Sequence, residues 1–116
     1  MTQTPFKRIL LAGGLLLAAG MANAQDTPQE IVLTIKNHTF TPKEVKIPAG
    51  KKVRLIVVNE DPTPAEFESN SLGREKIIPG KARAVVIVGP LKPGRYDFFE
   101  EFHQSLPSAH GVIVVE

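Results

Sequence analysis

The sequence contains no cysteine and no tryptophan, and these absences exclude several kinds of chemistry. Without cysteine the chain has no disulfide, no thiol nucleophile, no iron–sulfur cluster and no thiolate metal ligand. It also lacks the Gly-x-Ser-x-Gly and His-Glu-x-x-His motifs of common hydrolases. Both methionines, Met1 and Met21, lie near the N-terminus. Any metal ligand further along the chain must therefore be a carboxylate, an imidazole, a hydroxyl or a backbone group.

The sequence also has little continuous hydrophobicity, and its longest apolar run, residues 9–19, stands near the start. Lys7 and Arg8 precede this run, and Ala-Asn-Ala at 22–24 follows it. A short basic start, a short apolar stretch and a small-residue cleavage site are typical of a secretory signal peptide. We therefore expect residues 1–24 to be a cleaved signal peptide and the mature protein to be a soluble periplasmic domain, residues 25–116. The alternative is an uncleaved membrane anchor.

An excess of charge of one sign is missing from the expected mature domain. The whole chain has 14 basic and 12 acidic residues, and two of the basic ones, Lys7 and Arg8, belong to the expected signal peptide. The remaining 92 residues are near neutral, which argues against a nucleic-acid-binding groove. This length suits one small domain with a single hydrophobic core.

Apolar and polar residues alternate along most of the expected domain. Ile31, Leu33 and Ile35 occupy alternate positions, as do Val53, Leu55 and Val57 and the apolar residues of 82–88, 94–99 and 111–116. Proline and glycine recur between these stretches, and sustained helical periodicity is absent after residue 24. The pattern predicts an all-β antiparallel sandwich.

The segments after Asn59 and Phe99 are the expected location of a site. Both follow strongly apolar strands that run in the same direction, so both loops are expected at one end of the sandwich. Binding sites are commonly built on such loops. One loop leads to Glu66 and Glu68, and the other contains Glu100, Glu101, His103 and His110.

Two long segments resemble the cupredoxin family. Residues 40–68, FTPKEVKIPAGKKVRLIVVNEDPTPAEFE, resemble its first half, and residues 91–115, LKPGRYDFFEEFHQSLPSAHGVIVV, resemble its ending. The resemblance implies a Greek-key β-sandwich of about seven to eight strands. The position of the blue-copper cysteine falls at Glu100, and that of the first histidine ligand falls near Ala65, whereas His103 keeps a ligand type. Because a thiolate is required, blue-copper electron transfer is excluded.

Three shorter motifs, in order, resemble the EfeO-type cupredoxin-like family of bacterial iron uptake. They are Glu66-Phe67-Glu68, the segment REKIIPG at 74–80, and the segment PGRYD at 93–97. Some members of that family carry cysteine where this chain has Phe40 and Glu100. The resemblance implies a metal site with an iron and/or copper ion, assistance in oxidising ferrous iron, and two partners, a membrane iron permease and a periplasmic iron-binding protein. Its acidic positions correspond to Glu66, Glu68, Glu75 and Asp97.

Each candidate residue also has an ordinary structural interpretation. Glu66 and Glu68 share one face of a strand, where a cation would relieve their repulsion, but solvent-facing strands also carry such pairs. Glu100 and His103 have a usable ligand spacing, with Glu101 a weaker candidate. The remaining candidates are His110, which a loop cap would also explain, and Asp97 and Glu75, which neighbouring arginines would pair. His38 is expected to be structural or exposed.

Three hypotheses from different classes follow. The first is a metal-binding accessory protein of ferrous-iron uptake. The second is a copper-handling cupredoxin-like protein unrelated to iron. The third is a structural or adhesive sandwich without a metal, for which added metal would leave the melting temperature unchanged.

Overall fold

The computed structural model describes residues 27–116, which form nine strands and two short 3₁₀ helices. The strands are β1 (Gln29–Lys36), β2 (Thr39–Thr41), β3 (Glu44–Ile47), β4 (Val53–Asn59), β5 (Ala65–Ser69), β6 (Arg74–Ile78), β7 (Arg83–Val88), β8 (Gly94–Glu100) and β9 (His110–Val115); the 3₁₀ helices are η2 (Glu101–His103) and η3 (Pro107–Ala109). The expected signal peptide, residues 1–24, lies outside the described residues. Within the described part, no helix has the length and hydrophobicity needed to cross a membrane.

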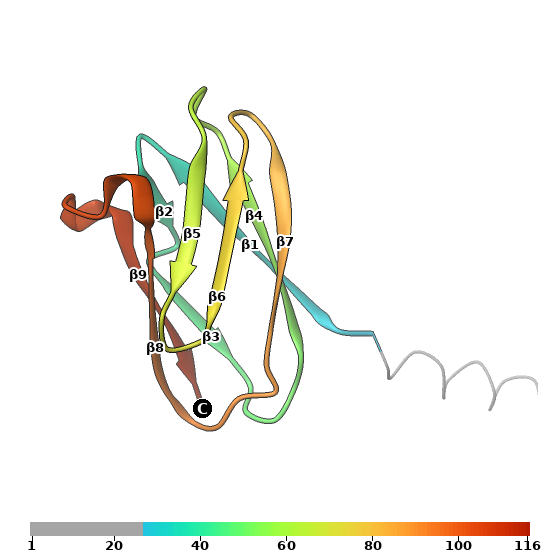
Figure 1. Ribbon diagram of the computed structural model, residues 1–116. Helices are drawn as coiled ribbons and strands as arrows, with labels where there is room; N and C mark the ends of the chain where they lie inside the picture. The colour runs from blue at the N-terminus through green and yellow to red at the C-terminus, as the bar shows by residue number, and fades with distance from the viewer. Residues whose placement is uncertain (1–26) are drawn as a thin grey trace, which may run out of the picture.

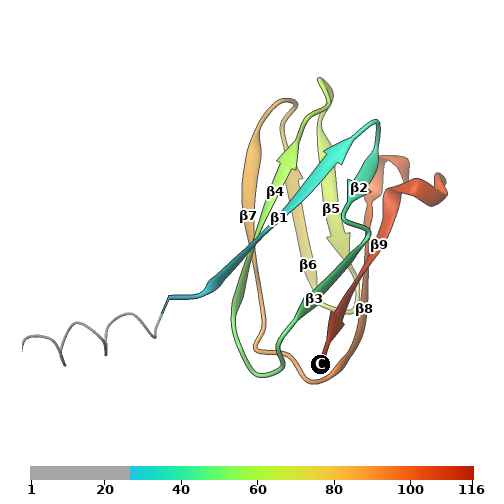
Figure 2. The same cartoon turned by 180° about the vertical axis from the view of Figure 1, so that it is seen from behind.

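The strands form two sheets that pack face to face (Figure 1). One sheet has the order β2-β1-β4-β7, and the other has the order β3-β9-β8-β5-β6. The prediction of an all-β sandwich is confirmed. The expectation of a wholly antiparallel arrangement is wrong, because β1 pairs with β4 and β3 pairs with β9 in parallel (Figure 2). Parallel pairs join strands that are distant in sequence, and local turn signals therefore do not reveal them.

The core lies between the sheets and is built from the alternate residues that the sequence pattern identified. Phe40, Phe67 and Phe98 are its largest fully buried side chains. The ring of Phe98 meets Phe40 edge to face at 4.8 Å and stacks on Phe67 at 5.3 Å between centroids. Such aromatic pairs contribute about 0.5–1.5 kcal/mol each beyond their buried area. The packing fixes β2, β5 and β8 relative to one another.

The parallel pairing of β1 and β4 brings two loops to one end of the sandwich. Ile35 lies opposite Asn59 in this register, and the backbone N–H of Glu60 donates to the carbonyl of Ile35 at 2.8 Å. The β1–β2 turn and the loop that follows β4 therefore start side by side. The segment after β8 reaches the same end, where η2 contacts β5.

Asn59 anchors the loop after β4. Its side chain is buried, and Nδ2 donates to the carbonyls of Thr63 at 2.8 Å, Ile78 at 3.1 Å and Pro79 at 3.2 Å. Its Oδ1 accepts the backbone N–H of Asp61 at 3.0 Å. One amide thus joins the end of β4, the following loop and the end of β6.

Replacing Asn59 with alanine should destabilise the protein, because it leaves buried backbone groups without partners. The expected loss is about 1–3 kcal/mol in the free energy of unfolding. In a domain of this size each kcal/mol corresponds to a fall of about 4–8 °C in melting temperature. Asn70→Ala is the matched control, because Asn70 is exposed and its side chain forms no hydrogen bond within residues 27–116. Equal melting temperatures for the two variants would contradict this role of Asn59.

Candidate metal centre

Two groups of potential metal ligands lie close together in the structure. The histidine cluster consists of His38, Glu100 and His103. The carboxylate cluster consists of Glu66, Glu68 and Glu75. Within each cluster, one ligand atom from every member lies within 4.8 Å of the others. This spacing makes each cluster a candidate metal site.

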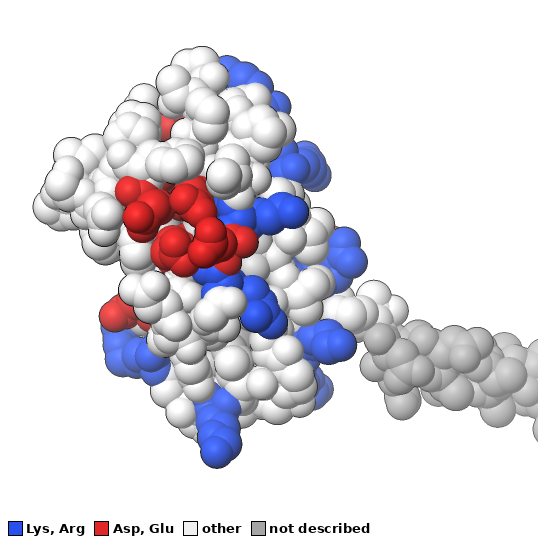
Figure 3. Space-filling view, in the orientation of Figure 1, with Lys and Arg blue, Asp and Glu red and all other residues white. Residues whose placement is uncertain are grey.

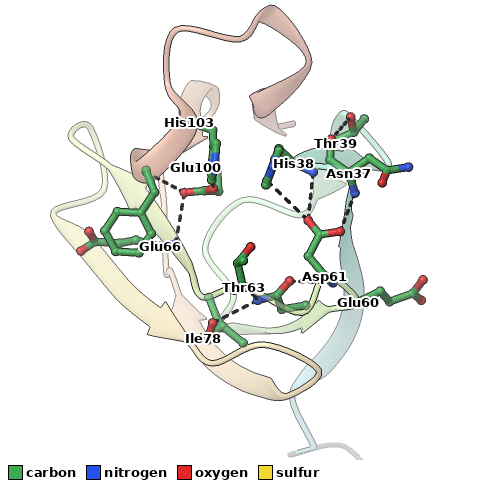
Figure 4. Close-up of polar contacts among 12 residues, drawn as sticks. Asn37, His38, Thr39, Glu60, Asp61, Thr63, Glu66, Ile78, Glu100 and His103 are labelled. Atoms are coloured by element: carbon green, nitrogen blue, oxygen red, sulfur yellow. Dashed lines mark hydrogen bonds and ion pairs between the residues drawn. The ribbon is translucent and has the colours of Figure 1, made fainter.

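Glu100 is the last residue of β8, and its side chain is fully buried. Its Oε2 accepts the backbone N–H of Phe102 at 2.7 Å, capping η2, and also the backbone N–H of Glu66 at 3.3 Å. Its Oε1 contacts Nδ1 of His103 (Figure 4). A buried carboxylate requires such partners, because removal from water is costly for an unpaired charge. Glu100 therefore ties η2 to β5.

His38 and His103 place their rings side by side. The two rings are stacked, with centroids 3.5 Å apart and planes inclined by 15° (Figure 4). About a third of each side chain is exposed, 33% for His38 and 31% for His103. His38 comes from the β1–β2 turn and His103 from the end of η2. The two rings of the histidine cluster are thus partly accessible to solvent, and the cluster joins elements from both sheets.

Asp61 holds the turn that carries His38. Asn37 and His38 both have left-handed backbone conformations, with φ of 51° and 56°. The Asp61 carboxylate accepts the backbone N–H groups of Asn37 at 2.7 Å and His38 at 3.0 Å. Its Oδ2 also lies 3.5 Å from Nδ1 of His38. These contacts stabilise a turn that non-glycine residues adopt uncommonly.

The charge state of Asp61 follows from the same contacts. Burial alone would raise the pKa of Asp61. The two backbone N–H groups, the His38 ring and the ammonium group of Lys81 act in the opposite direction, and the pKa is lowered overall. Asp61 is therefore ionised at neutral pH and presents a negative charge to the His38 ring.

The carboxylate cluster lies on the outer face of the five-stranded sheet. Ala65, Phe67 and Ser69 of β5 point into the molecule, so Glu66 and Glu68 point outward. Glu68 lies directly opposite Glu75 of β6 in the antiparallel register. Figure 3 shows acidic side chains gathered on the face over these strands.

Crowding of like charges changes the acidity of this cluster. Burial raises the pKa of Glu66, and the neighbouring charges of Glu75 and Glu68 raise it further. Burial and the charges of Glu75 and Glu101 likewise raise the pKa of Glu68. Glu66 has only 9% of its surface exposed, and none of the three cluster residues forms an ion pair with Lys or Arg within residues 27–116. The cluster is an assembly of acids without a basic partner in that part of the chain.

The two clusters occupy opposite faces of β5. Glu100 pairs with Phe67, which points into the core, whereas Glu66 and Glu68 point outward. The two loops meet as expected, since the backbone of Glu66 donates to Glu100. Their ligands nevertheless assemble into two groups rather than into one shared site.

The other predicted ligands belong to neither group. Asp97 is exposed in β8, where its backbone carbonyl accepts the hydroxyl of Ser69 at 2.6 Å. His110 directs Nε2 to the carbonyl of Gln104 at 2.6 Å and stacks on Phe99, which supports the loop-cap interpretation. Glu101 acts on the carboxylate cluster through its charge.

Sequence reasoning underrated His38 and overlooked Asp61. Both belong to turns that come together only through the parallel pairing of β1 with β4. The sequence contains only a weak signal for the turn that carries His38. Asn-His between two strand-like segments is compatible with a left-handed turn, because asparagine and histidine adopt that conformation more readily than most residues.

The donor atoms determine which metal ions fit. The histidine cluster offers imidazole nitrogen and a carboxylate, which suit Cu(II), Zn(II) or iron, and it has no thiolate for a blue-copper centre. The carboxylate cluster offers only oxygen, which suits harder cations such as iron. Of the two clusters, only the histidine cluster therefore offers nitrogen donors.

Comparisons with known structures agree with this fold. The metal-binding domain of the Cu(I)-exporting ATPase CopA of Streptococcus pneumoniae D39 superposes with a TM-score of 0.69 at 16% identity, covering 79% of this chain and 89% of that one. Auracyanin A, a blue copper protein of Chloroflexus aurantiacus, gives 0.66 at 15% identity, covering 78% and 100%. Amicyanin of Paracoccus versutus gives 0.59 at 22% identity, covering 80% and 87%.

Sequence comparisons identify the family of the chain, whereas the structural matches show the fold alone. Uncharacterized protein RP394 of Rickettsia prowazekii (strain Madrid E) is 44% identical over 96 residues, which cover 83% of this chain and 75% of that protein. The family model for the cupredoxin-like domain matches residues 8–115. The chain therefore belongs to the cupredoxin-like domain family.

Proposed function

We propose that this protein is a periplasmic metal-binding accessory protein of ferrous-iron uptake, which binds iron and/or copper. The observation that carries the proposal is the carboxylate cluster. Glu66, Glu68 and Glu75 place ligand oxygens within 4.8 Å of one another and form no ion pair with Lys or Arg within residues 27–116. Burial, and after it the repulsion of neighbouring carboxylates, raises the pKa of Glu66 and Glu68, and a bound cation would offset both effects.

The choice of iron follows from the oxygen donors and from the EfeO-type motifs. Carboxylates bind hard cations, and Fe(III) is harder than Fe(II). Tighter binding of the oxidised ion favours oxidation of bound Fe(II). A copper ion in an adjacent or shared site would accept the electron, so that Fe(II) and Cu(II) become Fe(III) and Cu(I). The resemblance of the Glu66-Phe67-Glu68 motif and the 74–80 segment to iron-uptake proteins supports delivery to a membrane permease and cooperation with a periplasmic iron-binding protein.

A second candidate function is copper handling unrelated to iron. The histidine cluster favours it, because imidazole nitrogen binds copper more tightly than it binds iron of the same charge. His38 and His103 are partly exposed, so an ion can reach them from solvent. In this alternative the histidine cluster is the functional centre and the carboxylate cluster is a surface feature.

Removing one carboxylate should weaken iron binding without affecting copper binding. We expect the purified protein to bind Fe(II) under anaerobic conditions with a dissociation constant in the micromolar range. Glu68→Gln should weaken that binding at least tenfold, because it removes one of three ligands. His103→Ala should weaken Cu(II) binding and leave Fe(II) binding unchanged. Isothermal titration calorimetry of the unmutated protein and of both variants with Fe(II), Cu(II) and Zn(II) measures these affinities.

Glu44→Gln is the control, because Glu44 is exposed on β3 and belongs to neither cluster. Absence of Fe(II) binding in the micromolar range, or equal Fe(II) affinity of the Glu68 and Glu44 variants, contradicts the carboxylate site. Cu(II) binding alone favours the copper-handling alternative. Absence of any binding, with no change in melting temperature on adding metal, favours a structural sandwich.

Glu75→Gln should stabilise the metal-free protein, because it removes one of the like charges in the carboxylate cluster. Like charges directly opposite each other across a strand pair are destabilising. We expect the melting temperature at pH 7 to rise by a few degrees at most. The raised pKa values of Glu66 and Glu68 mean that ionisation of these two groups is unfavourable in the folded state. The gain should therefore disappear as the pH falls and Glu66 and Glu68 become protonated. Thermal unfolding from pH 7 to pH 4, beside Glu44→Gln, checks this.

On acidification, metal binding at the carboxylate cluster should weaken at a higher pH than it would for glutamates of ordinary pKa. The pKa values of Glu66 and Glu68 lie above the ordinary value of 4.5, so protons compete with the cation at a higher pH. Calorimetric affinities measured between pH 7 and pH 5 should fall progressively. An affinity that stays constant down to pH 5 contradicts metal binding by these two carboxylates.

A further inference from the structure

We propose that the outer face of the four-stranded sheet is a docking surface for an anionic phospholipid bilayer. This face carries a row of aliphatic side chains across β1, β4 and β7, with basic side chains on the same strands and on the neighbouring strand β6. Both metal clusters lie elsewhere, so the contact with lipid is separate from the proposed metal-binding function and can be measured without any metal.

The aliphatic row follows the register of three adjacent strands. Val32 lies opposite Ile56 in the parallel pair of β1 and β4, and Ile56 lies opposite Val85 in the antiparallel pair of β4 and β7. The neighbouring strand positions, such as Leu33, are buried in the core, so the row points outward. Ile87 extends the row along β7. Water reaches most of it, with exposed fractions of 56% for Val32, 39% for Val85 and 36% for Ile87.

A row of aliphatic side chains is unusual on this side of a sandwich. The outer face of a sheet with one solvated side normally carries polar residues. Strand propensity does not demand valine or isoleucine there, because threonine is also a good strand former, as at Thr34 on the same face of β1. Contiguous exposed apolar side chains are typical of a surface that contacts another molecule or a membrane. The aliphatic row therefore indicates a contact surface.

The charges on the same strands are mostly positive. They are Lys36 on β1, Arg54 on β4 and Arg83 on β7, with one acid, Glu30. Glu30 pairs with Arg54 at 3.1 Å. Lys36 and Arg83 are exposed and form no ion pair within residues 27–116. Their charges are therefore available to an anionic partner.

Strand β6 adds two bases beside the edge of the same sheet. β7 is the last strand of its sheet, and the side chain of Arg74 reaches it, where Nε donates to the carbonyl of Ile87 at 3.0 Å. Lys76 follows two residues later on β6 and is exposed. Figure 3 shows basic side chains along the β7 edge of the molecule, beside the acidic side chains over β5 and β6. Opposite charges thus gather on different surfaces of a domain whose sum of charges is near zero.

The size of the aliphatic row argues for lipid rather than for a second copy of the chain. Strands about 4.8 Å apart and alternate residues about 6.8 Å apart give an apolar area on the order of 200 Å². A stable dimer buries about 800 Å² per partner. A bilayer has no such minimum, because burial of a small apolar area and attraction of basic side chains to anionic lipids add to each other. Docking through this face would hold the carboxylate cluster on the opposite side of the sandwich, away from the lipid phosphates.

Nuclear magnetic resonance of residues 25–116 tests the docking face without any substitution. These residues contain all nine described strands and the core between them, and they leave the apolar run 9–19 out of the measurement. Bicelles that contain phosphatidylglycerol and a spin-labelled lipid should broaden the amide signals of Val32, Ile56 and Val85. The signals of β9, in the other sheet, should stay sharp. Broadening confined to the five-stranded sheet, or no broadening at all, overturns the proposal.

Co-sedimentation with vesicles measures the contribution of the charges. The unmutated residues 25–116 should bind vesicles of phosphatidylglycerol and phosphatidylcholine in equal parts, and should bind vesicles of phosphatidylcholine alone much more weakly. Each base near an anionic lipid surface strengthens binding roughly fivefold. The double variant Lys36→Gln, Arg83→Gln should therefore lower the partition coefficient by roughly tenfold or more. Added salt should also lower it, because salt screens the attraction.

The double variant Lys46→Gln, Arg95→Gln is the matched control. Lys46 and Arg95 are exposed on β3 and β8 of the other sheet, so the control removes the same charge from the opposite face. Stacked sheets lie about 10 Å apart, which is about a Debye length at 0.1 M salt, so the control should lose about twofold at most. Val32→Ser should weaken binding roughly threefold or more, because it removes exposed aliphatic surface.

Several results contradict lipid docking and leave the metal titrations untouched. Equal losses in the two double variants, or equal binding to the two kinds of vesicle, show that neither this face nor anionic lipid is recognised. Self-association in sedimentation velocity that Val32→Ser abolishes, without vesicle binding, assigns the face to a second copy. Saturable binding of poly-glutamate, without vesicle binding, assigns it to an acidic protein segment. If a variant fails to fold, judged by its melting temperature, the bicelle spectra of the unmutated protein decide.

Discussion

The buried carboxylate of Glu100 is the constraint on which the candidate site depends. A carboxylate removed from water costs several kcal/mol unless donors surround it. Here the donors come from β5, from the first turn after β8 and from a histidine ring, through Glu66, Phe102 and His103. Three separate segments must therefore meet at one point for the charge to be accommodated. The position of η2, and with it the position of His103, follows from that requirement.

The alternation of β5 divides the chemistry of the molecule into two parts. The same strand sends Phe67 into the core beside Glu100 and sends Glu66 and Glu68 outward. A nitrogen-containing cluster on one side and an oxygen-only cluster on the other can prefer different metals, because donor softness governs that preference. The repulsion within the carboxylate cluster lowers the stability of the metal-free state. Cation binding would recover it, so binding and stability are coupled at this surface.

Much of the fold was predictable from the sequence, and the reasons are local. Alternation identified the strands, and a period of two placed Glu66 and Glu68 on one face. Glu100 and His103 stand three residues apart at the end of a strand, so their meeting also follows from short-range geometry. Glu75 was reached through family resemblance, since a cross-strand register is not visible in one sequence. The contact between His38 and Asp61 depends on the parallel pairing of β1 with β4. Local turn motifs in the sequence do not predict that pairing.

Glu100 relates the candidate site to the fold in a way that a metal ligand would not. In the cupredoxins that this chain resembles, that position supplies a ligand, whereas here its oxygens serve the backbone of η2 and β5. The ring that stacks on His103 is that of His38, which belongs to the turn between β1 and β2 in the opposite sheet. An ion bound at the histidine cluster would contact side chains from the β1–β2 turn and from η2. Because unfolding separates the two sheets, occupancy of the histidine cluster must stabilise the whole domain as well as its loops.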